Sequence, residues 1–358
     1  RSEERAVEEL GAHLEDAVRI RMVAEVPLGA FLSGGVDSSA VVAVMAGLSA
    51  TPVNTCAIGF GDPKYDETQY AARVAAQYRT RHYTEQVAAG DFSALNQLAA
   101  VYDEPFADAS ALPTYRVCQL ARKHVTVALS GDGGDESFAG YRRYKWHLRE
   151  ERLRSLLPAG LRRPLFGSLG KAYPKLDWAP RLFRAKTTLQ SLAMDTVEGY
   201  FHGVSVIASP LRDRLLSPAF KRRLQGYNAL HVFRSHQAQS PTPHPLHMIQ
   251  YIDLKTYLAG GILTKVDRAS MAHGLEVREP LLDHKLIEWA SSLPSHMKLR
   301  RGESKYLLKK SLEHRLPRTI LYRPKQGFSV PIAGWFRNEL RNELRSALLG
   351  SVMADCGI

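Results

Sequence analysis

The chain has 358 residues, of which 45% are hydrophobic, enough to bury one large core or two modest ones. It contains no run of about 18 apolar residues, so no membrane span is expected, and its charged first segment lacks the apolar stretch of a signal peptide. We therefore expect a cytoplasmic protein. The three cysteines, Cys56, Cys118 and Cys356, are widely spaced and suggest neither a disulfide framework nor a zinc site.

The formal net charge of +12 is concentrated in one part of the sequence. Residues 142–186 contain 13 Lys or Arg and 3 Asp or Glu. Such a segment could meet nucleic acid, an acidic membrane surface or an acidic protein partner. No motif for base stacking or groove recognition accompanies it, so we favour a solvated helical face and expect no nucleic-acid partner.

The first half of the chain alternates between strand and helix patterns. The strand patterns lie at 26–32, 53–60 and 125–129. The helical patterns lie at 3–22, 38–48, 67–77 and 112–123. Asp66 and Gln69 are expected to cap the helix that starts near residue 67. This alternation predicts an α/β fold with a parallel sheet that helices cover on both faces.

Beyond about residue 140 the strand patterns fade, and the sequence predicts helices interrupted by prolines and by a polar loop at 235–245. We expect an N-terminal helix at 1–25, an α/β core at 26–150 and a mainly helical remainder at 151–358. Ligands of open α/β sheets bind at the carboxyl ends of the strands. Three loops follow predicted strand ends, at 33–39, 59–66 and 130–136.

The first of these loops reads SGGVDSS and has the composition of a phosphate site. Its serines and glycines offer hydroxyl groups and accessible backbone N–H groups at a helix N-terminus. Asp37 would be repelled by phosphate unless a cation lay between them, which suggests Mg²⁺. The loop has no GK[ST] and so is not a Walker A sequence. It fits a reaction in which pyrophosphate leaves as a unit.

The third loop, SGDGGDE, is rich in glycine and in carboxylates. Its glycines let the backbone approach a ligand closely. Asp132, Asp135 and Glu136 place three carboxylates within five positions, which is costly unless a metal or a cationic group is present. Asp135 is predicted to be the second Mg²⁺ ligand, opposite Asp37.

Together these two loops resemble the synthetase domain of the glutamine-hydrolysing asparagine synthetase family. Further matching motifs are YDEPFADASALPTY (102–115), LTKVDRASMAHGLEVREPLLDH (263–284), KYLLKK (305–310) and RPKQGFSVPIAGWFR (323–337). The motifs are most similar to those of the asparagine synthetase-like amidotransferases that accompany exosortase and exopolysaccharide gene clusters in bacteria. The resemblance covers nearly the whole chain and implies a parallel-sheet core of the adenine-nucleotide alpha-hydrolase (ATP pyrophosphatase) type, with a large helical C-terminal part.

The resemblance implies a reaction that uses ATP and Mg²⁺. A substrate carboxylate attacks the α-phosphorus of ATP, pyrophosphate leaves, and ammonia attacks the resulting acyl-adenylate to give an amide and AMP. Aspartate is the default acceptor of the family, and a polysaccharide-related carboxylate is the alternative. Catalysis would then consist largely of positioning and electrostatic stabilisation.

The resemblance also implies roles for individual residues. The residues implied to hold pyrophosphate are Ser33, Gly34, Gly35, Asp37, Ser38 and Ser39. Those implied to line the adenosine site are Leu32, Ile58, Ser130 and Gly131. Lys325 matches a lysine that stabilises the charged transition states, and Asp132 matches a position associated with substrate and incoming ammonia. Asp37 and Asp135 match the Mg²⁺ ligands.

Several other charged residues have two interpretations, structural pairing or substrate contact. They are Asp103, Glu104, Lys265, Asp267, Arg268, Glu276, Arg278 and Asp283. Gly261 stands where the family often has an acidic or amide residue, and Glu279 stands where an apolar residue is common. Either departure could alter substrate choice or local packing.

The family hydrolyses glutamine with an N-terminal cysteine on a separate domain. This sequence starts at Arg1 and its first cysteine is Cys56, so we expect a fragment to which an N-terminal glutaminase domain would deliver ammonia. A homodimer is one possible assembly. A tRNA-modifying ATP pyrophosphatase would share SGGVDSS but not the later motifs. A non-catalytic nucleotide-binding scaffold would have lost loop residues, whereas Asp37, Asp135 and Lys325 are all present.

Overall fold

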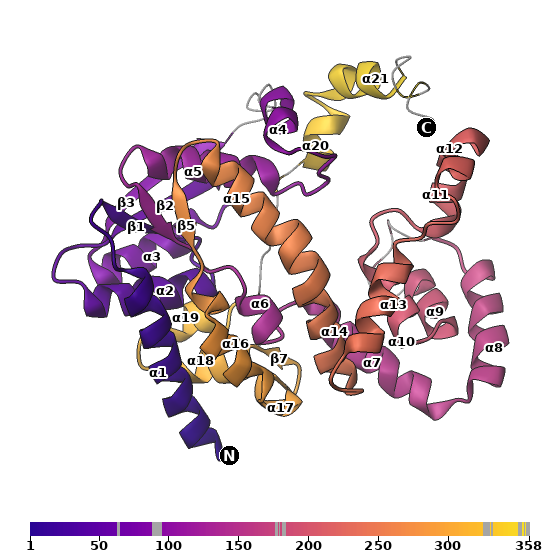
Figure 1. Ribbon diagram of the computed structural model, residues 1–358, viewed down its shortest axis with the longest axis horizontal. Coiled ribbons are helices and arrows are strands. Elements are labelled where there is room, and N and C mark those ends of the chain that lie inside the picture. The colour runs from indigo at the N-terminus through magenta and orange to yellow at the C-terminus, as the bar shows by residue number, and fades with distance from the viewer. Residues whose placement is uncertain are drawn as a thin grey trace. The chain divides into compact units, whose positions relative to one another are not determined.

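Five parallel strands form the main sheet, in the order β3-β2-β1-β4-β5 (Figure 1). The strands are β1 (Leu28–Phe31), β2 (Asn54–Phe60), β3 (Arg81–Val87), β4 (Val127–Leu129) and β5 (Glu276–Arg278). In this computed structural model the described residues are 1–62, 65–87, 95–175, 178, 180, 184–324, 330, 332–349, 353 and 355. The pairing registers include Ala30 with Thr55 and with Leu129, so the loops after β1 and β4 start side by side.

Helices cover both faces of this sheet, as the sequence predicts. On one face Ala57 joins an apolar cluster with Leu10, Val41 and Leu307. On the other face Ile58 joins a cluster with Leu112. Neighbouring residues of one strand point to opposite faces. The helices of the first cluster include α1 (Glu3–Arg21), α2 (Val36–Leu48), α3 (Thr68–Tyr78), α16 (His284–Ser291), α18 (Tyr306–Ser311) and α19 (Arg318–Leu321). Those of the second include α4 (Leu95–Val101), α5 (Ala111–Arg122), α15 (Thr264–Met271) and α20 (Ile332–Arg337).

The strand and helix predictions for the first half of the chain are confirmed within a few residues. Asp66 accepts hydrogen bonds from the backbone N and the hydroxyl of Thr68, 2.9 and 2.7 Å long, at the start of α3. Cys56 and Cys118 are buried, and burial raises the pKa of the Cys56 thiol to about 12. Cys356 lies outside the described residues.

The later part of the chain is mainly helical and also contains three short strands that the sequence analysis does not predict. Strand β5 pairs in parallel with β4 at the edge of the main sheet. Strands β6 (Leu299–Arg300) and β7 (Glu303–Ser304) form a short antiparallel hairpin. These strands are mostly polar and only two or three residues long. Strand β5 pairs with a strand that is distant in the sequence, and β6 pairs with β7 across a turn.

The structure divides into two compact units. The first contains the sheet and spans residues 1–140 and 257–342, and the second spans 141–256 and 343–358. Other elements of the first unit are α6 (Gly134–Ser137), a 3-10 turn (Pro280–Leu282) and α17 (Ser295–Lys298). Gly261 lies in a π-helix (Leu254–Leu263), a rare element that is frequent at functional sites.

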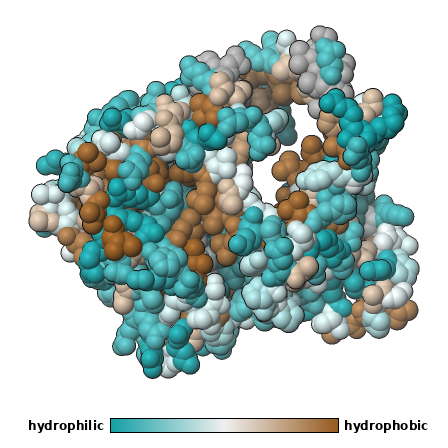
Figure 2. All heavy atoms as spheres, viewed as in Figure 1, coloured by the Kyte–Doolittle hydropathy of each residue, from teal (hydrophilic) through white to brown (hydrophobic). Residues whose placement is uncertain are grey.

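The second unit is helical and buries several polar groups in addition to a small apolar cluster that contains Val197, Met248 and Ile252. Its helices are α7 (Arg142–Leu156), α8 (Ala159–Ala172), α9 (Lys186–Ala193), α10 (Thr196–Val204), α11 (Ser209–Leu215), α12 (Pro218–Arg223), α13 (Leu230–Gln239) and α14 (Pro245–Asp253). Asp253 accepts hydrogen bonds from Arg143, Tyr144 and Tyr200, which ties α7 and α10 to α14. Figure 2 shows apolar side chains on the surface at the lower right, where α7 passes into α8.

Candidate active site

The loop between β1 and α2 is closed by its own hydroxyl groups. Ser33 Oγ and Ser38 Oγ lie 3.0 Å apart, and the Gly35 backbone N donates to Ser33 Oγ at 3.3 Å. Gly34 has φ +71°, and a Cβ there would lie 2.6 Å from the backbone N of Ala71, so glycine is required. Gly35 caps the N-terminus of α2, where the helix dipole favours an anion.

The loop after β4 packs directly on the start of α2, and glycines make this approach possible. A Cβ on Gly131 would lie 2.6 Å from the backbone N of Ser38, and one on Gly134 would lie 2.5 Å from Asp37 Oδ1. The two predicted loops are therefore in contact, as their places on neighbouring strands β1 and β4 require.

Asp37 and Asp135, the two predicted metal ligands, converge on one buried cation, Lys305. The Lys305 ammonium donates to Asp37 Oδ2 and lies 2.7 Å from Asp135 Oδ1. Burial opposes the charge of Lys305, but the carboxylates of Asp135 and Asp37 outweigh it and raise the pKa of the lysine. The site thus holds two carboxylates, from the first turns of α2 and α6, and one ammonium group.

Lys305 is not among the residues predicted to form the site. In the sequence analysis it appears only as the first residue of the motif KYLLKK, without a role of its own. The residue adopts the left-handed conformation, φ +54° and ψ +33°, immediately before α18, and its backbone N donates to the Phe138 carbonyl. The signal that could have found it is the excess of carboxylates in SGDGGDE, which demands a cation. Lys305 fits that need, because it directly precedes the buried leucines of α18.

A second pair of carboxyl groups lies at the carboxyl ends of β4 and β5. Asp132 accepts a hydrogen bond from the Ser130 hydroxyl, and the Ser130 backbone N donates to the Arg278 carbonyl at 2.8 Å. This bond places Glu279 beside the 130–132 loop. Burial, and then the charge of Asp132, raise the pKa of the Glu279 carboxyl to about 7. Glu279 therefore lies next to the candidate site.

Arg323 links the phosphate-type loop to the motif that contains Lys325. Its guanidinium donates to the Gly34 carbonyl at 3.1 Å and lies 2.5 Å from Glu67 at the start of α3. Lys325 itself lies outside the described residues. In the sequence it follows Arg323 by two positions.

The remaining predicted nucleotide residues differ in their surroundings. Leu32 and Ser130 are buried directly after β1 and β4, and Ser39 is buried near the start of α2. Ile58 is buried two residues before the end of β2 and belongs to an apolar cluster that includes Leu112. Its place is therefore within a strand and not in a loop.

Most of the charged residues with two interpretations have partners in the structure. Lys265 lies 2.7 Å from Ser110 Oγ and 3.3 Å from Asp108, and Arg268 lies 2.6 Å from Asp103. Arg278 lies 2.6 Å from Glu276 and also donates to two backbone carbonyls, those of Arg21 and Val23. Asp283 accepts from Arg21 at 3.0 Å and caps α16. Glu104 is exposed.

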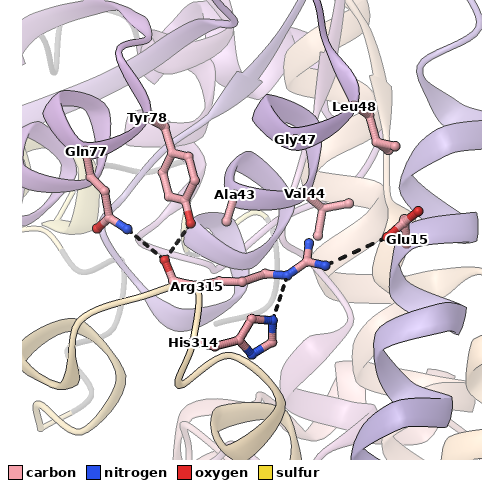
Figure 3. Close-up of a pocket in the computed structure, with 9 residues that line it drawn as sticks. All are labelled: Glu15, Ala43, Val44, Gly47, Leu48, Gln77, Tyr78, His314 and Arg315. Atoms are coloured by element: carbon pink, nitrogen blue, oxygen red, sulfur yellow. Dashed lines mark hydrogen bonds and ion pairs between the residues drawn. The ribbon is translucent and has the colours of Figure 1, made fainter.

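A pocket of about 370 Å³ lies at the other end of α2 (Figure 3). Its lining residues are Glu15, Ala43, Val44, Gly47, Leu48, Gln77, Tyr78, His314 and Arg315. Gln77 and Tyr78 donate to the Arg315 carbonyl at 2.7 and 2.5 Å (Figure 3). Gly47 follows Gly35 by twelve positions, roughly 18 Å along a helix. This pocket is therefore separate from the strand-end site.

Comparisons with known proteins agree with this geometry. The sequence profile of the family described as "Asparagine synthase" matches residues 9–355. The chain is 31% identical over 349 residues to asparagine synthetase [glutamine-hydrolyzing] 1 of Bacillus subtilis, which is 97% of this chain and 53% of that protein. It is 37% identical over 349 residues to a Mycobacterium tuberculosis protein that carries the asparagine synthetase name provisionally, 97% of this chain and 51% of that protein.

A more distant relative, "Amidase chyE" of Penicillium rubens, is 24% identical over 391 residues, which is 96% of this chain and 55% of that protein. The chain thus spans about half the length of the curated relatives that it matches. The family has a core of the adenine-nucleotide alpha-hydrolase type, which the five-stranded parallel sheet and its flanking helices match. The profile covers nearly all of the chain, and the chain belongs to the asparagine synthase family.

Proposed function

We propose that this chain catalyses ATP-dependent amide formation through an acyl-adenylate. A carboxylate oxygen of the acceptor attacks the α-phosphorus of ATP, and the bond to pyrophosphate breaks. Ammonia then attacks the acyl carbon, loses a proton, and displaces AMP to leave an amide. The observation that supports this most strongly is the convergence of Asp37, Asp135 and Lys305 beside a hydroxyl-rich loop at a helix N-terminus.

Charge explains why this arrangement suits pyrophosphate release. Negative charge develops on the β- and γ-phosphates as the bond breaks, and pre-oriented N–H groups and cations stabilise it most where water is excluded. The proposed pyrophosphate residues are Ser33, Gly34, Gly35, Asp37, Ser38 and Ser39, and Lys305 joins them here. Leu32, Ile58, Ser130 and Gly131 are proposed for adenosine.

Asp37 and Asp135 fit a Mg²⁺ ion, because hard oxygen ligands from carboxylates are what that ion takes. Mg²⁺ would neutralise phosphate charge and orient the polyphosphate for in-line displacement. These two side chains would hold the ion, and Lys305 would remain as a positive group next to the phosphates.

Lys325 is proposed to stabilise the charged transition states, from the motif that Arg323 connects to Gly34. Asp132 is proposed to approach the acceptor and the incoming ammonia from the loop after β4. Ion pairs account for Asp103, Glu276 and Arg278, so we propose structural roles for these three. Exposed Glu104 is the one of this group for which substrate contact stays open.

The acceptor is proposed to be aspartate by default, with a polysaccharide-related carboxylate as the alternative. Ammonia would come from a glutaminase domain, since the relatives' names describe glutamine hydrolysis and their length is about twice that of this chain. Glu279 lies at the edge of the candidate site and is proposed to influence which acceptor is used.

The test is product analysis with ATP, Mg²⁺, ammonia and either L-aspartate or a sugar acid. AMP and pyrophosphate in equal amounts, formed only when a carboxylic acid is present, are expected. Asp135→Asn should reduce their formation by at least about a hundredfold if the carboxylate acts in the charged transition state. Formation of ADP and phosphate would contradict the proposal, and turnover that requires tRNA in place of a carboxylic acid would favour a tRNA-modifying enzyme.

A further inference from the structure

The outward face of α7 carries cations, an indole and leucines in one stripe. Arg142, Trp146, Arg149, Leu153 and Leu156 follow one another at intervals of three or four residues, which places them on one side of a helix. All five are exposed, Trp146 to 43% and Leu156 to 74%. The buried residues of α7 are Tyr144, His147 and Arg154. The helix therefore buries a histidine and an arginine, while a tryptophan and two leucines lie exposed among its surface arginines.

Helix α8 continues this unusual distribution. Leu161, Leu165 and Leu169 recur every four residues and are exposed to 64%, 49% and 46%. The side that α8 buries against α9 contains Arg162 and Gly170 instead. Arg162 donates to the Met194 carbonyl at 2.6 Å, and a Cβ on Gly170 would meet Gln190 at 2.9 Å. Packing within this unit does not explain why these three leucines lie on the same exposed side of α8.

The charged side chains of this region separate by sign. Glu150 and Glu151 of α7 both form ion pairs with Arg154. The guanidinium lies 3.3 Å from Glu150 and closer to Glu151. The exposed charged residues of α7 and α8 are all cations, namely Arg142, Arg149, Arg152, Arg163 and Lys171. The acidic groups of α7 are thus paired, while the charge that these two helices expose is positive, although Arg154 and Arg162 are buried.

The same asymmetry holds for the whole chain. Residues 141–256 contain 20 Lys or Arg and 7 Asp or Glu, an excess of 13 positive charges. The rest of the chain contains 28 Lys or Arg and 29 Asp or Glu, so it is close to neutral. The net charge of +12 therefore resides entirely in the segment that exposes the leucines.

Three kinds of partner could cover such a face, and the combination of side chains distinguishes them. Nucleic acid would use the cations but leaves no role for five exposed leucines, since its affinity comes from the phosphate backbone. A second copy of this chain would bring two positively charged faces together, which opposes association. An anionic lipid bilayer accepts all of the components, because acyl chains take leucines, the interface takes tryptophan, and anionic headgroups attract arginine.

We propose that the surface formed by the outward sides of α7 and α8 docks on an anionic phospholipid membrane. Leu153, Leu156, Leu161, Leu165 and Leu169 enter the headgroup and acyl boundary, with Trp146 at the interface. The cations hold the surface to the headgroups, and the association is peripheral and reversible. Trp146 lies between two arginines, with Arg149 5.1 Å and Arg142 5.9 Å from the ring centre. Within the described residues no helix is long and apolar enough to cross a bilayer.

The experiment measures co-sedimentation of the full-length protein with vesicles. Vesicles of phosphatidylcholine mixed with phosphatidylglycerol should sediment the protein, and vesicles of phosphatidylcholine alone should not. Raising the salt concentration should weaken the binding, because exposed charges are screened. Equal binding to both vesicle types, or binding to neither, would overturn the proposal. Binding to RNA without binding to anionic vesicles would overturn it in favour of the nucleic-acid alternative.

Paired variants separate the apolar contribution from the charge contribution. Leu161→Ser/Leu165→Ser should lower the partition coefficient at least about tenfold, since two leucines no longer leave water. Arg142→Gln/Arg149→Gln should lower it about fivefold per charge removed. The matched controls are Leu348→Ser/Leu349→Ser, two exposed leucines of α21 (Arg341–Leu349), and Arg73→Gln/Arg81→Gln, two exposed arginines elsewhere.

All four variants should keep the circular dichroism and the carboxylate-dependent pyrophosphate release of the parent, because none is placed in the candidate active site. If the control pairs weaken vesicle binding as much as the α7 and α8 pairs do, the outward sides of these helices are not the docking surface. If the leucine pair changes the oligomeric state in size-exclusion chromatography and leaves vesicle binding intact, the face is a protein interface and the proposal is wrong.

Discussion

The ammonium group of Lys305 lies where two carboxylates would otherwise repel each other. Asp37 and Asp135 come from the first turns of two different helices, α2 and α6, and their charges are largely buried together with that of the lysine. Removing one partner of a buried ion pair leaves an uncompensated charge and is strongly destabilising. The residue therefore has a structural role in addition to whatever it contributes to the reaction.

Lys305→Met is expected to lower the free energy of unfolding by about 3–5 kcal/mol, measured by urea denaturation. Lys310→Met is the matched control, because Lys310 lies in α18 and its ion pair with Glu313 is largely solvated. Mg²⁺ alone should raise the melting temperature of Lys305→Met more than that of the parent, since the two carboxylates have lost their cation. Equal stability of the two lysine variants would contradict this role.

Glu279 predicts a pH dependence of stability. Its pKa rises to about 7 through burial and through the nearby charge of Asp132, while Arg21 opposes the rise. The folded state therefore binds its proton more tightly than the unfolded state does. The protonated carboxyl therefore stabilises the folded state fully below the ordinary glutamate pKa, and this stabilisation is lost as the pH rises through about 7. The free energy of unfolding should fall by up to roughly 3 kcal/mol as a result.

Glu279→Gln removes this titration. The variant should become more stable relative to the parent as the pH rises from about 5 to about 8.5, in urea denaturation at both pH values. A stability difference that is the same at both pH values would show that the Glu279 carboxyl titrates normally in the folded protein.

At the scale of elements, the loop after β4 can pack closely against the start of α2 because it contains glycines. A Cβ on Gly131 would lie 2.6 Å from the backbone N of Ser38, which cannot move without displacing the start of the helix. Gly131→Ala should therefore destabilise the protein by about 1–3 kcal/mol and reduce pyrophosphate release. Thermal denaturation and product analysis would measure the two effects.

Gly47→Ala is the internal control for this prediction. Gly47 lies within α2, and a Cβ added there would have no neighbouring atom within 4 Å among the described residues, so alanine should stabilise the helix by roughly 0.5–1 kcal/mol. If Gly131→Ala proved as stable as the parent, the close packing of the two loops would be incorrect.

The elements that the sequence predicts well are those whose pattern is local. Strands β1, β2 and β4 lie in the centre of the sheet and are buried, so they read as apolar runs. In the five-stranded sheet, the strands that escaped prediction are β3 and β5, which are its edge strands. Their sequences, RHYTEQV and EVR, are polar because one side faces solvent, and only pairing with a distant strand makes them strands.

The candidate site follows the same distinction. Asp37 and Asp135 could be predicted as neighbours because each follows a strand, and parallel strands end at one edge. Lys305 could not, because it lies 268 positions from Asp37 in the sequence and no local pattern marks its approach. The individual catalytic and binding roles remain predictions.

The chain as a whole leaves the first unit at residue 141 and returns to it at residue 257. Nothing periodic in the sequence marks this return. The two units also differ in chemistry, since the segment 141–256 holds the whole positive excess and several buried polar groups. We therefore expect the units to respond differently to acid.

His147 makes the second unit sensitive to low pH. Burial, with a further contribution from Arg154, lowers the pKa of the ring to about 3, and within the described part of the chain neither ring nitrogen has a hydrogen-bond partner. The unfolded chain binds the proton at higher pH than the folded one, so this stability is present above about pH 6.5 and is lost as the pH falls towards 3.

Two pH units below the ordinary histidine pKa, the free energy of unfolding should have fallen by about 3 kcal/mol because of His147. His147→Phe should make this acid-induced fall smaller. His296→Phe, a change on α17 of the first unit, should leave it unchanged. Hydrogen exchange at acidic pH would show amides of α7 and α10 exchanging before those of β1 and β4. Simultaneous exchange in both units would contradict this expectation.

If a carboxylate becomes joined to AMP during the reaction, one of its oxygens must pass to the nucleotide, and transfer of ¹⁸O detects this step. The acceptor is supplied with ¹⁸O in its carboxylate, together with ATP, Mg²⁺ and ammonia, and the nucleotide product is examined by ³¹P NMR. We predict one ¹⁸O atom in the phosphate of AMP, because the acyl carbon loses that oxygen when ammonia displaces it. Label in inorganic phosphate together with ADP, or AMP without label, would contradict an acyl-adenylate.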